Sequence, residues 1–124
     1  MDDIINQEWQ YLYSYNPKIK AFCVCKGSEV IWQTSNWDLV SDAPTIIRAP
    51  RESAQKVVVN GVTYNRVDSN AERYIASATG DQGHLIVALI ELDNWAIAWA
   101  TSDAVPELAG IDLAYSAIQL VGNL

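Results

Sequence analysis

The chain has few of the residue types on which several common functions depend. It contains one histidine, two cysteines, and eight lysine and arginine residues against fifteen aspartate and glutamate residues, for a net charge of −7. Without a basic run, the chain would be repelled at long range by nucleic acid or an anionic membrane surface, so we expect neither partner. The longest apolar stretches fall short of a membrane span, and Met1-Asp2-Asp3 lacks the basic start of a secretory signal. We therefore expect a soluble, cytoplasmic protein with a single domain over residues 1–124.

Motifs for catalysis or for metal binding are also missing. His84 has no metal-ligand spacing around it, and the chain contains no nucleophile elbow, phosphate-binding glycine loop or zinc-protease motif. A pairing of Cys25 with His84 would lack a third group to orient the base, so it has little specificity. Cys23 and Cys25 are two residues apart on one predicted strand, so both sulfurs lie on the same face. This is a poor geometry for a disulfide, and we expect free buried thiols. We predict no enzyme, no metal and no cofactor.

Five short β-patterned runs follow one another between residues 56 and 101. They are Lys56 to Val59, Val62 to Val67, Arg73 to Ala78, His84 to Leu92 and Trp95 to Thr101. Asn60-Gly61 is the clearest connection, because both central residues of a type I′ turn need positive φ. None of the connections is long enough for a parallel crossover, so the sheet is predicted to be antiparallel. Ile19 to Val24 and Glu29 to Gln33 add a hairpin, which makes about seven strands.

Helical patterns lie at both ends of the chain and between the two groups of strands. Asp3 to Tyr15 is predicted to be a helix that Asn16-Pro17 ends. A brief helix follows the Ser41-Asp42-Ala43-Pro44 cap and ends at Pro50. The last helix runs from Glu107 to Val121, with an apolar face of Leu108, Ile111, Leu113, Tyr115, Ile118 and Val121. This order predicts an α/β (α+β) domain whose two terminal helices pack on one face of the sheet.

The five tryptophans are the richest signal for binding, because tryptophan is enriched in binding hot spots. On the last predicted strand, Trp95, Ile97 and Trp99 share one face, and alanines occupy the other. The alanine face allows a helix to lie close to the sheet. Trp9, Trp32 and Trp37 are the candidates for a surface aromatic platform that docks extended, proline-rich peptides. Ordinary half-buried packing is the alternative interpretation of these three.

Several segments of the chain resemble those of a small profilin. The run from Gly27 to Trp37 is similar to the profilin run Gly-Ser-Val-Trp-Ala-Gln-Ser-Ser-Asn-Phe with one residue inserted. Asn60-Gly61-Val62-Thr63-Tyr64 resembles the Gly-Gly-Thr-Lys-Tyr that opens the profilin meander, and Gly122-Asn123-Leu124 resembles the short Gly-Leu ending. The resemblance implies a profilin-like fold of divergent, archaeal type. It also implies a protein that binds monomeric actin and docks proline-rich peptides between its terminal helices.

The resemblance also implies site residues. By position, the peptide-binding residues would be Trp9, Tyr13, Trp32, Trp37 and Ile118, and the actin-binding residues would be Tyr74, Gly110 and Leu113. A roadblock-type domain is the alternative, because His84 to Leu89, Trp95 to Ala100 and the last helix are similar to that family too. That assignment would imply a homodimeric scaffold that regulates small GTPases. The short, proline-flanked middle helix and the five strand signals after it favour the profilin interpretation.

Overall fold

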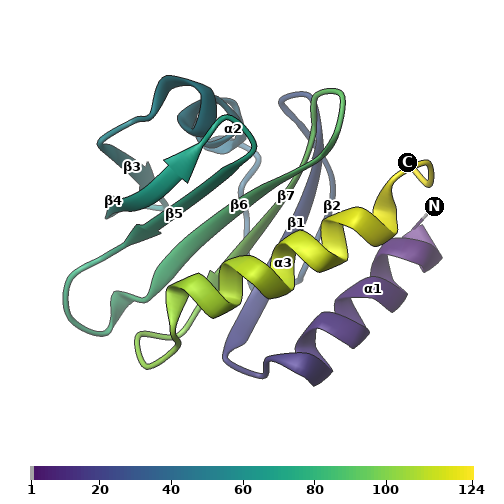
Figure 1. Cartoon of the computed structure of the whole chain (residues 1–124), viewed down its shortest axis with the longest axis horizontal. Helices are drawn as coiled ribbons and strands as arrows, with labels where there is room; N and C mark the ends of the chain where they lie inside the picture. The colour runs from purple at the N-terminus through teal and green to yellow at the C-terminus, as the bar shows by residue number, and fades with distance from the viewer. Residues whose placement is uncertain (1) are drawn as a thin grey trace.

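The computed structural model describes residues 2–124, and Figure 1 shows two helices lying side by side across one face of a twisted sheet. The helices are α1 (Asp2–Tyr15), α2 (Ala43–Glu52) and α3 (Pro106–Leu120), with a short 3-10 turn η1 (Gly80–Gln82). The strands are β1 (Ile19–Lys26), β2 (Glu29–Gln33), β3 (Lys56–Val59), β4 (Val62–Asn70), β5 (Arg73–Ser77), β6 (His84–Glu91) and β7 (Asn94–Ala100). The predicted fold class is confirmed.

All seven strands form one antiparallel sheet in the order β2-β1-β7-β6-β5-β4-β3. Strands β3 to β7 form a continuous meander, and β7 then pairs with β1, so that Phe22 lies opposite Ala98. The turn between β3 and β4 has the predicted geometry, with φ of 50° at Asn60 and 81° at Gly61. The sheet thus joins the two groups of strands that lie on either side of α2 in the sequence.

The sheet separates two hydrophobic cores. The core under α1 and α3 contains the three alanines of β7, which are Ala96, Ala98 and Ala100. The core on the α2 face contains Trp95 and Ile97 from the same strand, with Trp99 at its edge. The predicted alternation of β7 is therefore confirmed, and the small face lies under the terminal helices. Gly110 of α3 lies so close to β5 that a Cβ there would be 3.0 Å from Ile75 Cδ1.

Two local predictions about α2 need correction. Pro50 does not end the helix, which continues to Glu52, and Ser53 follows in a left-handed conformation with φ of 49°. Asp42 stands at the N-cap position, but its side chain makes no capping hydrogen bond. Its Oδ2 instead accepts a hydrogen bond from the backbone N–H of Asn60 at 2.9 Å. The carboxylate therefore ties the start of α2 to the β3–β4 turn rather than to its own helix.

Candidate functional site

Aromatic side chains gather where α1 crosses β1 and β2. We call this the aromatic cluster, and it consists of Trp9, Tyr13, Phe22 and Trp32. The Trp9 ring stacks on the Phe22 ring with their centroids 5.9 Å apart. The Trp32 ring is tilted against Phe22, and those two centroids are 6.0 Å apart. Tyr13 is 5.5 Å from Trp9 and is exposed, with the Lys20 ammonium 5.4 Å from its ring centre. Three of the five predicted peptide-binding residues are thus brought together.

The other two predicted peptide-binding residues lie elsewhere. Trp37 packs against the core on the α2 face, because the chain crosses from one face of the sheet to the other between β2 and α2. Ile118 lines a hollow between α3 and the strands β5 and β6, whereas Trp9 belongs to the core covered by α1. The prediction that these two residues join Trp9 in one groove is therefore wrong.

The predicted apolar face of α3 is also wrong in most of its members. Its buried residues are Ala109, Gly110, Leu113, Ser116, Ala117 and Leu120. Larger apolar side chains form an exposed row along the helix, which we call the α3 ridge: Leu108, Ile111, Tyr115 and Ile118. Their exposed fractions run from 51% at Tyr115 to 65% at Ile118. The sequence pattern assigns this ridge to the core, because a row of large apolar side chains on a helix usually faces the protein interior. In the structure the ridge is exposed instead.

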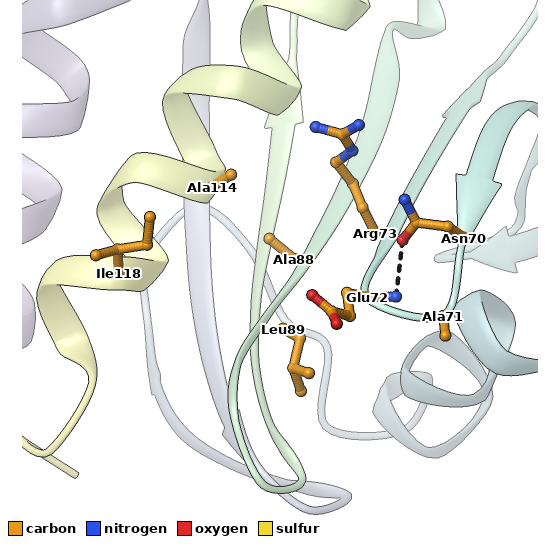
Figure 2. Close-up of a pocket in the computed structure, with 8 residues that line it drawn as sticks. All are labelled: Asn70, Ala71, Glu72, Arg73, Ala88, Leu89, Ala114 and Ile118. Carbon is orange, nitrogen blue, oxygen red and sulfur yellow. Dashed lines mark hydrogen bonds between the residues drawn. The ribbon is translucent and has the colours of Figure 1, made fainter.

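Beside the ridge is a hollow of about 530 Å³, which we call the α3 hollow (Figure 2). Its walls come from the β4–β5 turn, from β6 and from α3: Asn70, Ala71, Glu72, Arg73, Ala88, Leu89, Ala114 and Ile118. The Asn70 side chain accepts a hydrogen bond from the Glu72 backbone N–H at 2.8 Å, which shapes the turn. The hollow is therefore apolar on the α3 side and carries one acidic and one basic side chain on the turn side.

The three predicted actin-binding residues lie inside the protein. Tyr74 and Leu113 are fully buried, and the Tyr74 hydroxyl donates to the Ala54 carbonyl at 2.6 Å. Burial raises the pKa of Tyr74, and the positive charge of Arg66 opposes that rise. Gly110 is buried against Ile75. Gly110 and Leu113 therefore lie beneath the exposed surface of α3, whereas Tyr74 lies in the core on the α2 face. The assignment of these three residues to actin binding stays a prediction.

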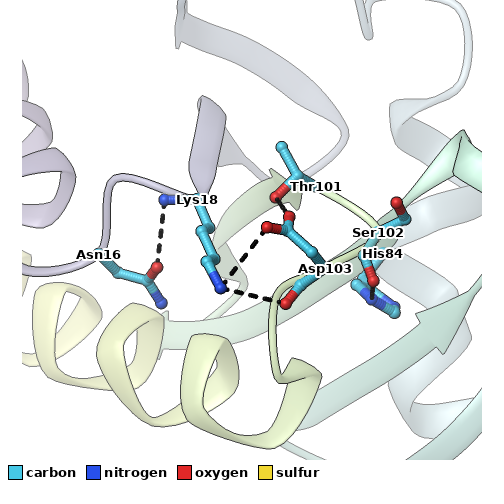
Figure 3. A network of polar contacts seen from close by, with 6 residues as sticks. All are labelled: Asn16, Lys18, His84, Thr101, Ser102 and Asp103. Carbon is cyan, nitrogen blue, oxygen red and sulfur yellow. Dashed lines mark hydrogen bonds and ion pairs between the residues drawn. The ribbon is translucent and has the colours of Figure 1, made fainter.

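A polar network joins the loop after β7 to the start of β1 (Figure 3). Lys18 Nζ donates to the Asp103 carbonyl at 3.2 Å and lies 3.6 Å from Asp103 Oδ2. The Thr101 hydroxyl donates to the same carboxylate, and this bond, followed by the charge of Lys18, holds the pKa of Asp103 below its usual range. His84 Nε2 lies 3.2 Å from the Ser102 carbonyl. The network fixes the entry into α3.

The junction between α1 and α3 contains a buried carboxylate. Glu8 is 7% exposed and Ser116 is fully buried, and neither Glu8 Oε2 nor Ser116 Oγ has a hydrogen-bond partner among residues 2–124. Burial raises the pKa of Glu8, and the nearby Ser116 hydroxyl opposes that rise. The geometry between the two side chains nevertheless falls short of a hydrogen bond. An ionised carboxylate here lacks the partners that it would have in water, so it opposes the docking of α1.

The remaining candidate groups for chemistry have structural partners. His84 Nε2 donates to the Ser102 carbonyl, which leaves Nδ1 to accept from the Ser77 hydroxyl at 2.6 Å. Cys23 and Cys25 are free, buried thiols with their sulfurs 3.9 Å apart. Across residues 2–124, no group of three or more His, Cys, Asp or Glu side chains is placed to hold a metal ion. Over the same span, no helix is long and apolar enough to cross a membrane.

The arrangement of elements places the chain in a known structural class. Its fold matches LokiProfilin2, solved in a complex with rabbit actin, with a TM-score of 0.91 at 19% identity and complete coverage of both chains. A profilin from Schizosaccharomyces pombe matches with a TM-score of 0.76 at 13% identity, over 91% of this chain and 93% of that chain. At such identities the likeness concerns the fold, and the fold is that of the profilins.

Similarity in sequence then decides the family. Thor profilin of Thorarchaeota archaeon (strain AB_25) is 34% identical over 120 residues, which cover 92% of this chain and 94% of that protein. Odin profilin of Odinarchaeota yellowstonii (strain LCB_4) is 33% identical over 61 residues, about half of each chain. No family model matches the chain. The chain belongs to the profilin family, and the roadblock alternative is not favoured.

Proposed function

We propose that this profilin binds monomeric actin through the α3 ridge and the α3 hollow. The ridge is the observation that carries the proposal, because four large apolar side chains are more than half exposed in one row. A row of this kind, next to a hollow, is typical of a protein–protein interface. The profilin relatives support actin as the partner, and LokiProfilin2, which shares the fold, was solved with rabbit actin.

The hollow supplies the polar part of the proposed interface. Glu72 and Arg73 stand on the β4–β5 turn, across the hollow from Ala114 and Ile118. A polar rim around an apolar centre is the usual arrangement at specific interfaces. The buried residues beneath the surface, Leu113 and Gly110, set how close α3 lies to the strands. In this proposal they position the ridge, and the exposed side chains make the contacts.

Replacing Ile118 by Asp tests the proposal. Ile118 is 65% exposed, so the change places a charge in the proposed interface and removes little core packing. We expect the affinity for labelled monomeric actin, measured by fluorescence titration, to fall by about tenfold or more. Val40→Asp is the matched control, because Val40 is 62% exposed in the loop before α2. Equal affinities for the Ile118 variant and the native chain would contradict the proposed face.

Proline-rich peptides are the second proposed ligand, and the aromatic cluster supports them. Stacked rings with one exposed edge suit the rigid, apolar surface of an extended proline-rich segment. Tyr13→Ala removes the exposed ring of the cluster, and Tyr11→Ala is its control on the same helix, since both tyrosines are more than two-fifths exposed. We expect only the Tyr13 change to weaken binding of a proline-rich peptide, by about threefold to tenfold. A loss of equal size at Tyr11 would argue against this site.

The proposed role is therefore that of a non-enzymatic binding protein that works in the cytoplasm with actin. Each of the two proposed surfaces consists mainly of aromatic and aliphatic side chains on different sides of the terminal helices. Because none of the residues of the aromatic cluster lines the α3 hollow, we expect both ligands to bind at once. A complex of all three components in analytical ultracentrifugation is the expected outcome.

A further inference from the structure

A second hollow, of about 260 Å³, opens on the α2 face of the sheet. Three aromatic rings from separate parts of the chain surround it: Trp37 from the loop after β2, Tyr64 from β4 and Trp99 from β7. We call it the three-ring pocket. Its other lining residues are Ala21, Asn36, Val59, Asn60 and Val62. Neither proposed ligand of this profilin uses these residues, because the α3 ridge and the aromatic cluster lie on the opposite face.

The rings are held in place by the surrounding structure. The Trp99 indole N–H donates to the Gln82 carbonyl at 3.0 Å, and Gly83 lies against the ring so closely that a Cβ there would be 2.6 Å away. Tyr64 is only 4% exposed. The backbone N–H of Trp37 donates to the Thr34 carbonyl at 3.1 Å, which fixes the turn that carries its ring. A preformed pocket avoids much of the entropy loss that binding otherwise requires.

The size of the pocket limits what can enter. Sites for whole drug-sized ligands or cofactors span about 300 to 1,000 Å³. At about 260 Å³, the three-ring pocket is suited to the end of a side chain or to a small head group. Its walls combine three aromatic side chains with the small apolar side chains Ala21, Val59 and Val62, and two amide residues complete the lining.

The pocket itself is uncharged, and the acidic balance of the whole chain favours a cationic ligand over an anionic one. None of its lining residues is charged, while the chain as a whole carries −7. The Asp42 carboxylate accepts a hydrogen bond from the backbone N–H of Asn60, which is one of the lining residues. Within residues 2–124, the two cation–π contacts involve other rings: Lys20 lies over Tyr13, and Arg51 over Trp95. The three rings of the pocket therefore have no cation of their own.

We propose that the three-ring pocket binds an alkylated ammonium group, of the kind found on a methylated lysine side chain or on choline. The negative faces of aromatic rings attract a cation, and several rings around one site bind quaternary ammonium groups. Methyl groups on the nitrogen fill the apolar walls and need no hydrogen bonds. An unmodified ammonium would lose three hydrogen bonds to water, and the pocket offers few acceptors in return.

The five indole N–H signals of the full chain in an ¹⁵N–¹H spectrum provide the readout. We would titrate choline and, separately, a short peptide with one trimethyllysine, at constant ionic strength. The expected result is saturable movement of the Trp37 and Trp99 signals, with Trp9, Trp32 and Trp95 unmoved. Whichever of the two ligands binds more tightly shows whether the alkylated ammonium group comes from choline or from a methylated lysine. 3,3-Dimethylbutan-1-ol, the neutral analogue of choline, is expected to bind at least about tenfold more weakly.

Variants separate the pocket from non-specific association. Trp37→Ala should weaken binding by about tenfold, whereas Trp32→Ala, on the other face of the sheet, should leave it unchanged. Tyr64→Phe keeps the ring and should also bind as the native chain does. The unmoved indole signals report whether each variant is folded. Absence of saturable binding by both cations, or equal binding of the neutral analogue, would overturn the proposal, whatever the outcome of the actin experiment.

Discussion

The two faces of β7 carry side chains of very different size. On one face, Ala96, Ala98 and Ala100 leave room for α1 and α3 to lie close to the sheet. On the other face, Trp95 and Ile97 fill a thick core that α2 covers in part. The difference shows how a single strand divides the molecule. Small residues let two helices lie close to one face of the sheet, and large residues fill a buried core on the other. The three-ring pocket lies at the edge of that thicker side.

Among changes on the two faces of β7, Trp95→Ala should lower the free energy of unfolding most. Trp95 is fully buried, its indole N–H donates to Asp93 Oδ1 at 2.9 Å, and the Arg51 guanidinium lies 5.3 Å from its ring centre. Truncation leaves a large cavity, so we expect the free energy of unfolding to fall by about 4 kcal/mol in urea titrations. A loss below about 1 kcal/mol would mean that the α2 face is not a packed core.

Gly83→Ala should have the next largest effect, on the side where Trp99 packs. Gly83 has φ of 82°, and an added Cβ would be 2.4 Å from the Ala100 carbonyl oxygen. We expect a loss of about 3 kcal/mol in the free energy of unfolding. Gly61→Ala is the control, because Gly61 has nearly the same φ but open space around it. That change should cost only about 1 kcal/mol. Equal losses at the two sites would contradict the close packing at Trp99.

Ala98→Leu tests the alanine face of β7, which lies under α1 and α3. Ala98 is fully buried under the terminal helices, between Phe22 on β1 and Ile86 on β6. A larger side chain must push α3 away from the sheet, so we expect a loss of about 2 kcal/mol in the free energy of unfolding. Ile97→Leu, a change of equal volume on the opposite face, should cost less, about 1 kcal/mol. If Ala98→Leu were the milder of the two, the helices would not be held close by small residues.

The same contrast explains which parts of the structure the sequence predicts. The alternation along β7 and the Asn60-Gly61 turn follow local rules of strand and turn geometry, and the structure has both. The buried face of α3 does not follow from its own sequence, because large apolar side chains project from more than one side of that helix. The sheet beneath decides the matter: Gly110 lies against Ile75 of β5, Ala117 shares a core with the alanines of β7, and Ile118 is left exposed.

The sites depend on longer-range effects. Trp9 and Trp32 come together because α1 lies across β1 and β2, which the order of elements predicts. Trp37 is only five residues from Trp32 in sequence, yet it lies on the other face, because the loop after β2 leads to α2. No local pattern records that crossing. Likewise, the three-ring pocket forms only because the curled sheet brings β4 near β7, three strands away in the sheet.

The smallest expected effect concerns the buried Glu8 between α1 and α3. Glu8→Gln removes a charge that has no hydrogen-bond partner at Oε2, so we expect a gain on the order of 1 kcal/mol in the free energy of unfolding at pH 7. The pKa of Glu8 is raised in the folded protein, so the folded state takes up its proton at a higher pH than the unfolded state. Through this group, the native chain gains stability as the pH falls from neutral through that raised pKa toward 4.5, the unperturbed value.

Unfolding of the native chain and of Glu8→Gln between pH 7 and pH 4 checks the sign. The difference in unfolding free energy between the two should shrink as the pH falls, because the protonated glutamic acid and the amide are both neutral. Glu29→Gln makes the same change in net charge at an exposed position of β2, so it should give no such convergence. A constant difference across the pH range would mean that Glu8 is not the titrating group at the junction of the two helices.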